Sequence, residues 1–160
     1  MSSNPKDSLK SMKIGLALGG GGVRGLAHIG VLKVLQREHI PIDFIAGTSM
    51  GGIIGALLAA GVSVEDMETE ALRVRSRRQT VKLLDLGFSS SGLIKGAGIH
   101  RYMSNLLGAE LTFDDLLTPL ALVAVDIHSG REVILREGKV VDALRATISV
   151  PVIRQQCFNP

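Results

Sequence analysis

The fold is decided by residues 42–60, which read IDFIAGTSMGGIIGALLAA. The apolar run Ile42–Ala46 predicts a buried strand, and the small and apolar residues 53–59 predict a buried helix that ends at Gly61. Between them, residues 47–51 (GTSMG) fit the pattern G-x-S-x-G. A strand, a sharp glycine turn and a helix form the setting of a nucleophile elbow, which exposes a serine hydroxyl on a strained turn.

Two glycines, Gly47 and Gly51, flank the serine of this turn, Ser49. Side chains at these positions would obstruct both the fold-back of the chain and the approach of a substrate. The start of the following helix would also place partial positive charge near Ser49, where negative charge develops during nucleophilic attack. An ordinary glycine turn is the alternative, but the flanking strand and helix favour the elbow.

A second glycine-rich segment, residues 19–22, follows another apolar run, Ile14–Leu18. Apolar residues then recur at helical spacing from Leu26 to Leu35, and Pro41 prevents the helix from continuing. Two strand–loop–helix units in succession predict a mainly parallel sheet that is covered on both faces. We therefore expect an α/β domain with three layers, α/β/α.

The remaining segments carry weaker patterns. Ser63 predicts the start of a helix that runs toward Arg78. Beyond it we expect a loop over residues 85–98, a helix over 99–107, a strand over 120–125, a hairpin turn at Ser129-Gly130 into a strand over 132–135, and a helix over 140–146.

The first glycine loop contains Gly20, Gly22 and Gly25 in the pattern G-x-G-x-x-G, which is also the dinucleotide-binding fingerprint. That fingerprint requires an acidic residue at the far end of the second strand, whereas Asp43 lies at the near end. No Gly-Lys-Ser/Thr follows, which excludes a P-loop. An oxyanion hole of backbone N–H groups beside Ser49 fits better. Arg24 either holds this loop, attracts an anionic substrate or is simply solvated.

Composition excludes several classes of function. The 160 residues are 46% hydrophobic and 3% aromatic, and too few aromatic rings are present for a surface that stacks nucleic-acid bases. The lone Cys157 excludes an internal disulfide and a cysteine-rich metal site. We find neither a secretion signal nor a membrane-spanning segment and expect a cytoplasmic protein that is free of nucleic acid.

Three motifs in order, GGGGVRG (residues 19–25), GTSMG (47–51) and ATISVP (146–151), resemble the patatin-like phospholipase family. The segment Val125-Asp126 with Gly130-Arg131-Glu132 is similar to the strand and hairpin of that family. The resemblance covers residues 13–153, which would be the N-terminal part of such a domain. Residues 1–12 are expected to be a disordered tail and residues 154–160 a divergent one.

The resemblance implies a lipid acyl hydrolase with a Ser-Asp dyad, no cofactor and no metal. Ser49 would be the nucleophile and Gly47 and Gly51 would form its elbow. The oxyanion loop would consist of Gly20, Gly21, Gly22, Arg24 and Gly25. The expected partner is a lipid or ester substrate.

The family's catalytic aspartate lies in an Asp-Gly motif beyond the third motif, and this sequence contains no Asp-Gly pair. We therefore expect a fold that is incomplete at the C-terminus and a chain without its dyad acid. A serine without a base is a poor nucleophile. An inactive fragment that at most binds lipid or a partner is the alternative. Six substitutes are conceivable, each with a structural role as the simpler interpretation: His28, His39, His100, His128, Asp43 and Asp126.

Peripheral contact with a membrane and self-association are further possibilities. The basic cluster Arg73, Arg75, Arg77, Arg78 and Lys82 would suit anionic lipid headgroups, although a solvated helix end is the simpler interpretation. Leu83, Leu84, Leu86 and Phe88 form either a lipid-facing flap or part of the core. Apolar sheet faces that lack partners would favour association between chains.

Overall fold

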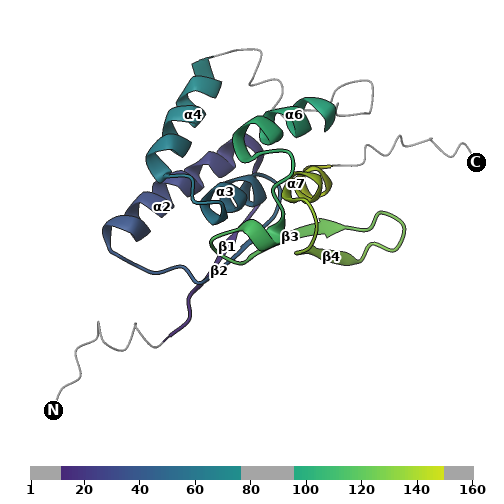
Figure 1. Cartoon of the computed structure of the whole chain (residues 1–160), viewed down its shortest axis with the longest axis horizontal. Coiled ribbons are helices and arrows are strands. Elements are labelled where there is room, and N and C mark those ends of the chain that lie inside the picture. Colours follow the sequence, from purple (N-terminus) through teal and green to yellow (C-terminus); the bar gives the residue numbers. More distant parts are fainter. Residues whose placement is uncertain (1–11, 77–95, 150–160) are drawn as a thin grey trace, which may run out of the picture.

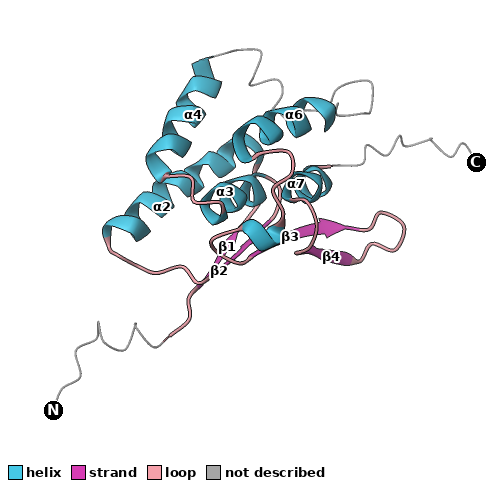
Figure 2. Cartoon of the chain, viewed as in Figure 1, coloured by secondary structure: helices cyan, strands magenta, loops and turns pink. Residues whose placement is uncertain are grey.

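The computed structural model describes residues 12–76 and 96–149 (Figures 1 and 2). Its elements are, in chain order, β1 (Gly15–Leu18), the 3-10 helix η1 (Gly22–Leu26), α2 (Ala27–Arg37), β2 (Phe44–Gly47), α3 (Met50–Ala59), α4 (Val64–Ser76), α6 (Gly96–Leu107), the 3-10 helix η2 (Phe113–Asp115), β3 (Leu120–Val125), β4 (Glu132–Leu135) and α7 (Val140–Ile148).

The four strands form one sheet in the order β1-β2-β3-β4. The pairs β1–β2 and β2–β3 are parallel, with Leu18 opposite Gly47 and Gly47 opposite Leu122. The pair β3–β4 is an antiparallel hairpin. Gly130 has φ 68° in the turn of this hairpin, a conformation that suits glycine. The predicted α/β class and the mainly parallel sheet are confirmed.

The described helices lie on one face of this sheet, whereas the sequence pattern predicted helices on both (Figure 1). The reason is the strand order, because both parallel crossovers, β1 to β2 and β2 to β3, advance in the same direction. Right-handed crossovers that advance in one direction place their helices on the same side. Within residues 12–76 and 96–149, α3 and α7 pack on the sheet, and α2 and α4 pack outside α3.

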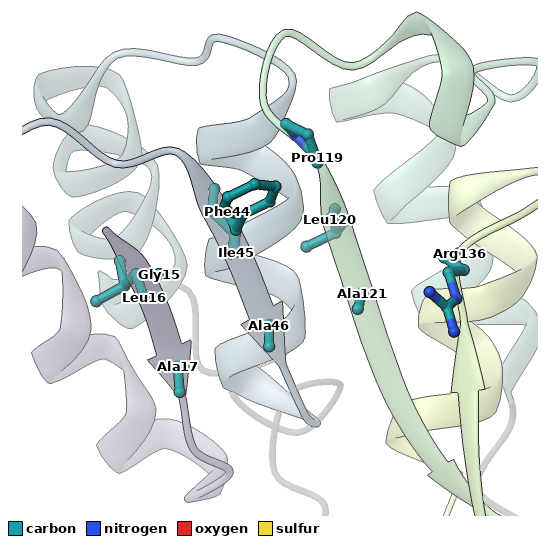
Figure 3. Close-up of a pocket in the computed structure, with 10 residues that line it drawn as sticks. All are labelled: Gly15, Leu16, Ala17, Phe44, Ile45, Ala46, Pro119, Leu120, Ala121 and Arg136. Carbon is teal, nitrogen blue, oxygen red and sulfur yellow. The ribbon is translucent and has the colours of Figure 1, made fainter. Parts of the chain in front are cut away.

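The opposite face of the sheet carries a cavity of about 570 Å³. Small residues of the three parallel strands, among them Ala17, Ala46 and Ala121, line it together with Phe44 and Arg136 (Figure 3). Phe44 is 51% exposed. Within the described part of the chain, this face is therefore apolar and accessible.

The core is built around α3, in which every residue except Leu58 is buried. This helix lies between the sheet and the outer helices, which explains its lack of a polar face. Packing against the sheet is close at Gly55, since a Cβ there would lie 2.9 Å from Cγ2 of Ile45. The elbow segment is therefore held by a rigid, fully packed helix.

Several predicted boundaries differ from the structure. The helix predicted over 99–107 begins earlier, at Gly96, and α7 continues to Ile148 instead of ending at residue 146. Ser63 does precede the first residue of α4, Val64, and caps the helix, because its Oγ accepts a hydrogen bond from the Asp66 N–H at 3.1 Å.

Some predictions concern residues outside those described. These are the tail over residues 1–11, Arg77, Arg78, Lys82, the apolar cluster Leu83, Leu84, Leu86 and Phe88, Cys157, and the segment from Val150 through Pro151 to the tail over 154–160.

Candidate active site

Ser49 lies between the end of β2 and the start of α3, where it is the N-cap of the helix. Its backbone has φ 52° and ψ −124°, a positive φ that non-glycine residues rarely adopt. Such a conformation costs on the order of 1–3 kcal/mol and persists only when surrounding contacts enforce it. This is the backbone geometry that a nucleophile elbow requires.

The glycines on either side of Ser49 are explained by close backbone contacts. A Cβ on Gly51 would lie 2.2 Å from the Leu18 carbonyl oxygen and 2.5 Å from that of Gly19. A Cβ on Gly47 would lie 2.7 Å from the Gly51 carbonyl oxygen. Since all these neighbours are backbone atoms, a side chain on Gly51 would force the turn away from the end of β1, and one on Gly47 would force the turn away from the start of α3.

The glycine loop after β1 lies directly beside this turn. A Cβ on Gly20 would lie 3.4 Å from the Ser49 Cβ. Farther along, a Cβ on Gly25 would lie 2.6 Å from the Met50 side chain. The structure therefore brings together the two glycine-rich segments that the sequence analysis singled out.

Internal hydrogen bonds hold the glycine loop. The Arg24 N–H donates to the Gly21 carbonyl at 3.1 Å, so this backbone donor is already used within the loop. His28 Nε2 lies 2.9 Å from the Gly19 carbonyl oxygen and donates to it when that nitrogen carries the proton. Gly22 has φ 55°, which favours glycine at the entrance of η1. His28 thus has a local structural role, as expected.

Thr147 is a residue of the site to which sequence reasoning gave no role. Its Oγ1 accepts a hydrogen bond from the Ser49 N–H at 3.1 Å and donates to the Val123 carbonyl. The Thr48 hydroxyl donates to the same carbonyl at 3.3 Å. The only signal in the sequence was that Thr147 belongs to the third motif of the resemblance.

The two candidate aspartates are engaged away from the elbow. Asp43 precedes β2, at the opposite end of the strand from Ser49, and pairs with Lys13 at 2.7 Å. The hydrogen bonds from the Lys13 ammonium and the Ile14 N–H hold the pKa of Asp43 below its usual value. Asp126 lies in the hairpin turn, where hydrogen bonds from the His128 N–H and the Ser129 hydroxyl lower its pKa.

His100 joins α6 to α7, with its Nε2 3.3 Å from Asp142 Oδ1. Its Nδ1 lies 3.5 Å from the Ser104 hydroxyl, an arrangement that superficially resembles a catalytic triad. However, the Ser104 hydroxyl donates to the His100 carbonyl at 2.8 Å. Ser104 also lies inside a helix, where backbone N–H groups are bonded along the helix and cannot hold an oxyanion.

The last two candidate bases, His39 and His128, have exposed side chains. Among residues 12–76 and 96–149, no hydrogen bond joins any of the six candidates to the Ser49 side chain.

The same described residues contain no group of three or more histidine, cysteine, aspartate or glutamate side chains arranged to bind a metal ion. None of their helices has the length and apolar character that crossing a bilayer demands.

An open cavity of about 290 Å³ lies at the carboxyl end of the parallel strands. Its walls come from β1, β2, β3 and the two glycine segments: Ala17, Leu18, Gly19, Ala46, Gly47, Thr48 and Val123. Ligands of open α/β sheets bind outside this end of the strands. The cavity therefore adjoins both the elbow and the glycine loop.

Comparison with known proteins agrees with this geometry. The family model described as patatin-like phospholipase matches residues 16–156. An uncharacterized NTE family protein of Mycobacterium tuberculosis is 34% identical over 141 residues, which cover 88% of this chain and 38% of that protein. A neuropathy target esterase of Drosophila grimshawi is 33% identical over 145 residues, 89% of this chain and 10% of the esterase. The chain thus spans about two fifths of the mycobacterial relative, and less of the insect one.

Two solved structures share the fold. ExoU of Pseudomonas aeruginosa, a protein of the type III secretion system solved in complex with SpcU, superposes with a TM-score of 0.65 at 19% identity, covering 88% of this chain and 39% of ExoU. VipD of Legionella pneumophila gives a TM-score of 0.55 at 12% identity, covering 83% of this chain and 41% of VipD. At these identities the likeness concerns the fold alone.

Proposed function

The chain belongs to the patatin-like phospholipase family, and from that premise we propose that it carries the nucleophile and the oxyanion hole of a serine-dependent lipid acyl hydrolase. The observation that supports this most is the strained backbone of Ser49 beside the glycine loop. The substrate class is a carboxylic ester of a lipid, either a phospholipid or a neutral ester.

In the proposed reaction the Ser49 hydroxyl oxygen attacks the carbonyl carbon of the ester, and a base takes the hydroxyl proton. The carbonyl oxygen becomes an oxyanion, which backbone N–H groups stabilise. Collapse of this intermediate releases the alcohol, which takes up the proton, and leaves an acyl group on Ser49. A water molecule then hydrolyses the acyl ester to a fatty acid and restores the serine.

The oxyanion donors are assigned to the glycine loop and to Met50. Met50 is the first residue of α3, so its N–H has no acceptor within the helix. Gly20 and Gly21 have no side chain of their own that could cover their backbone N–H groups. Gly22 and Gly25 shape the loop by their turn and by close packing against Met50. Arg24 belongs to the loop but is not assigned as an oxyanion donor, because its backbone N–H already donates to the Gly21 carbonyl.

The base is the missing part of this proposal. No Asp-Gly pair occurs in the sequence, and the six substitute candidates have other partners or exposed positions. We therefore assign the base to none of them, and the chain by itself should react slowly. Loss of triad members in another serine hydrolase left only about 10³- to 10⁴-fold catalysis over water.

The second candidate function is an inactive scaffold that binds lipid or another chain. The accessible apolar face of the sheet favours it, with Phe44 51% and Val125 63% exposed. Apolar patches of this kind mark interaction surfaces. Peripheral membrane contact also belongs to this candidate and predicts co-sedimentation with lipid vesicles.

The test is labelling with a fluorophosphonate followed by intact-mass measurement. The original chain and the Ser104→Ala control should each acquire one adduct over several hours, and Ser49→Ala should acquire none. An adduct that survives in Ser49→Ala would refute the assignment of the nucleophile. A folded original chain that stays unlabelled would favour the inactive scaffold.

A further inference from the structure

We propose that Thr147 is a positioning residue for the nucleophile, and that its hydroxyl fixes the strained backbone of Ser49. This inference rests on the proposed function, because it assigns Thr147 a task in presenting Ser49. Thr147 lies in the last turn of α7, far from Ser49 in the sequence, and reaches the elbow only through the packing of α7 on the sheet.

The Thr147 hydroxyl makes three polar contacts: with the Ser49 N–H, with the Val123 carbonyl and, at 3.4 Å, with the Thr48 hydroxyl. Ser49 N is a donor, so Thr147 Oγ1 must act as the acceptor in their 3.1 Å contact. The single hydroxyl proton of Thr147 is then available for the Val123 carbonyl, to which it donates. One hydroxyl thus links the elbow to β3, and its orientation is fixed from both sides.

The methyl group of Thr147 is held as closely as the hydroxyl. A Cβ added to Gly52 would lie 3.2 Å from Thr147 Cγ2 and 3.0 Å from Leu122 Cδ2. The β-branched side chain therefore fits between α3 and β3 and has little freedom to rotate. This packing explains how Thr147 of α7, 98 residues beyond Ser49, sets the direction of the Ser49 N–H group.

The bond also determines which N–H groups remain for the oxyanion. Because the Ser49 N–H points to Thr147, it is not a donor to the developing charge. The donors that remain are those of Met50 and the glycine loop. Thr147 therefore acts through Ser49 and does not itself touch the substrate.

The test compares Thr147→Val, which keeps the shape without the hydroxyl, with Thr147→Ser, which keeps the hydroxyl. Amide hydrogen exchange of Ser49, followed by NMR, reports the bond directly and needs no activity. We expect Thr147→Val to speed this exchange about tenfold, the equilibrium effect of losing an ordinary hydrogen bond. Thr147→Ser should restore the slow exchange. Thr69→Val is the matched control, since the Thr69 hydroxyl also donates to a backbone carbonyl, that of Glu65, on a distant helix.

The second readout is the rate at which a fluorophosphonate labels Ser49. It should fall in Thr147→Val and recover in Thr147→Ser, while the melting temperatures of the two variants stay similar. Unchanged Ser49 exchange in Thr147→Val, or failure of Thr147→Ser to restore both readouts, would overturn the proposal. If Thr147→Val does not unfold cooperatively, Thr147→Ala replaces it under the same criteria. A chain that is never labelled refutes the proposed function, and the exchange measurement still decides the role of Thr147.

Discussion

The Cβ of Ser49 lies 3.4 Å from the position that a Cβ would occupy on Gly20. Ser49 follows β2 and Gly20 follows β1, and the two strands are parallel neighbours. Their carboxyl ends therefore meet at one edge of the sheet, which places the strained serine against a loop without side chains.

Gly51→Ala should destabilise the chain and prevent labelling of Ser49. The added Cβ would meet the Leu18 and Gly19 carbonyl oxygens at 2.2 and 2.5 Å, so the elbow and the end of β1 must separate. Forced overpacking of this kind costs about 1–3 kcal/mol. Thermal unfolding measures the first effect and intact mass the second.

Gly30→Ala is the matched control for this substitution. Gly30 is an exposed residue within α2, and a Cβ there would have no neighbour within 4 Å. Alanine should stabilise the helix by about 0.5–1 kcal/mol and leave labelling unchanged. Equal behaviour of the two variants would refute the steric explanation of Gly51.

Gly20→Ala should leave the fold intact but slow the labelling of Ser49. The new methyl group would sit in van der Waals contact with the Ser49 Cβ and cover one approach to the hydroxyl. In Gly19→Ala the methyl group would meet nothing within 4 Å, and labelling should proceed at the original rate. If both variants are labelled as fast as the original chain, the glycine loop does not border the reacting atoms.

His28→Ala should loosen the glycine loop, because it removes the ring nitrogen that lies 2.9 Å from the Gly19 carbonyl oxygen. We expect slower labelling of Ser49 with a change in unfolding free energy of only about 1 kcal/mol, the net contribution of one hydrogen bond. His128→Ala, in the exposed hairpin turn, serves as the control. Unaltered labelling in His28→Ala would show that the loop does not depend on this bond.

The sequence patterns predicted the elements that position the site. Apolar runs marked β1 and β2, the small apolar residues marked α3, and Ser129-Gly130 marked the hairpin, because each signal is local. Which face of the sheet the helices cover was not predictable in this way. It depends on the direction in which successive crossovers advance across the sheet, and no local pattern of residues indicates that direction.

The same distinction applies to the candidate site. Ser49, Gly47 and Gly51 were recognisable because the elbow motif is continuous in the sequence. The hydrogen bond from Ser49 to Thr147 joins distant segments and depends on how α7 packs, so sequence reasoning assigned Thr147 no role. Catalytic roles for these residues remain predictions that the labelling experiments address.

Asp43→Asn should remove part of the acid sensitivity of the fold. Hydrogen bonds from Lys13 and the Ile14 N–H lower the pKa of Asp43 in the folded chain, so its carboxylate stabilises the fold above its unfolded pKa. That stabilisation is lost as the pH falls through the lowered folded pKa. The original chain should therefore melt higher than Asp43→Asn near neutral pH, and the difference should shrink below about pH 4. A difference in melting temperature that is independent of pH would contradict this account.

The most direct test of the central claim is the pH dependence of Ser49 labelling by a fluorophosphonate. If Ser49 is the nucleophile and lacks a base within the chain, its rate should follow the alkoxide fraction and rise about tenfold per pH unit between about pH 6 and 9. Ser49→Ala should show no adduct throughout. A rate that levels off near neutral pH would reveal a base among these residues, and an adduct in Ser49→Ala would place the nucleophile elsewhere.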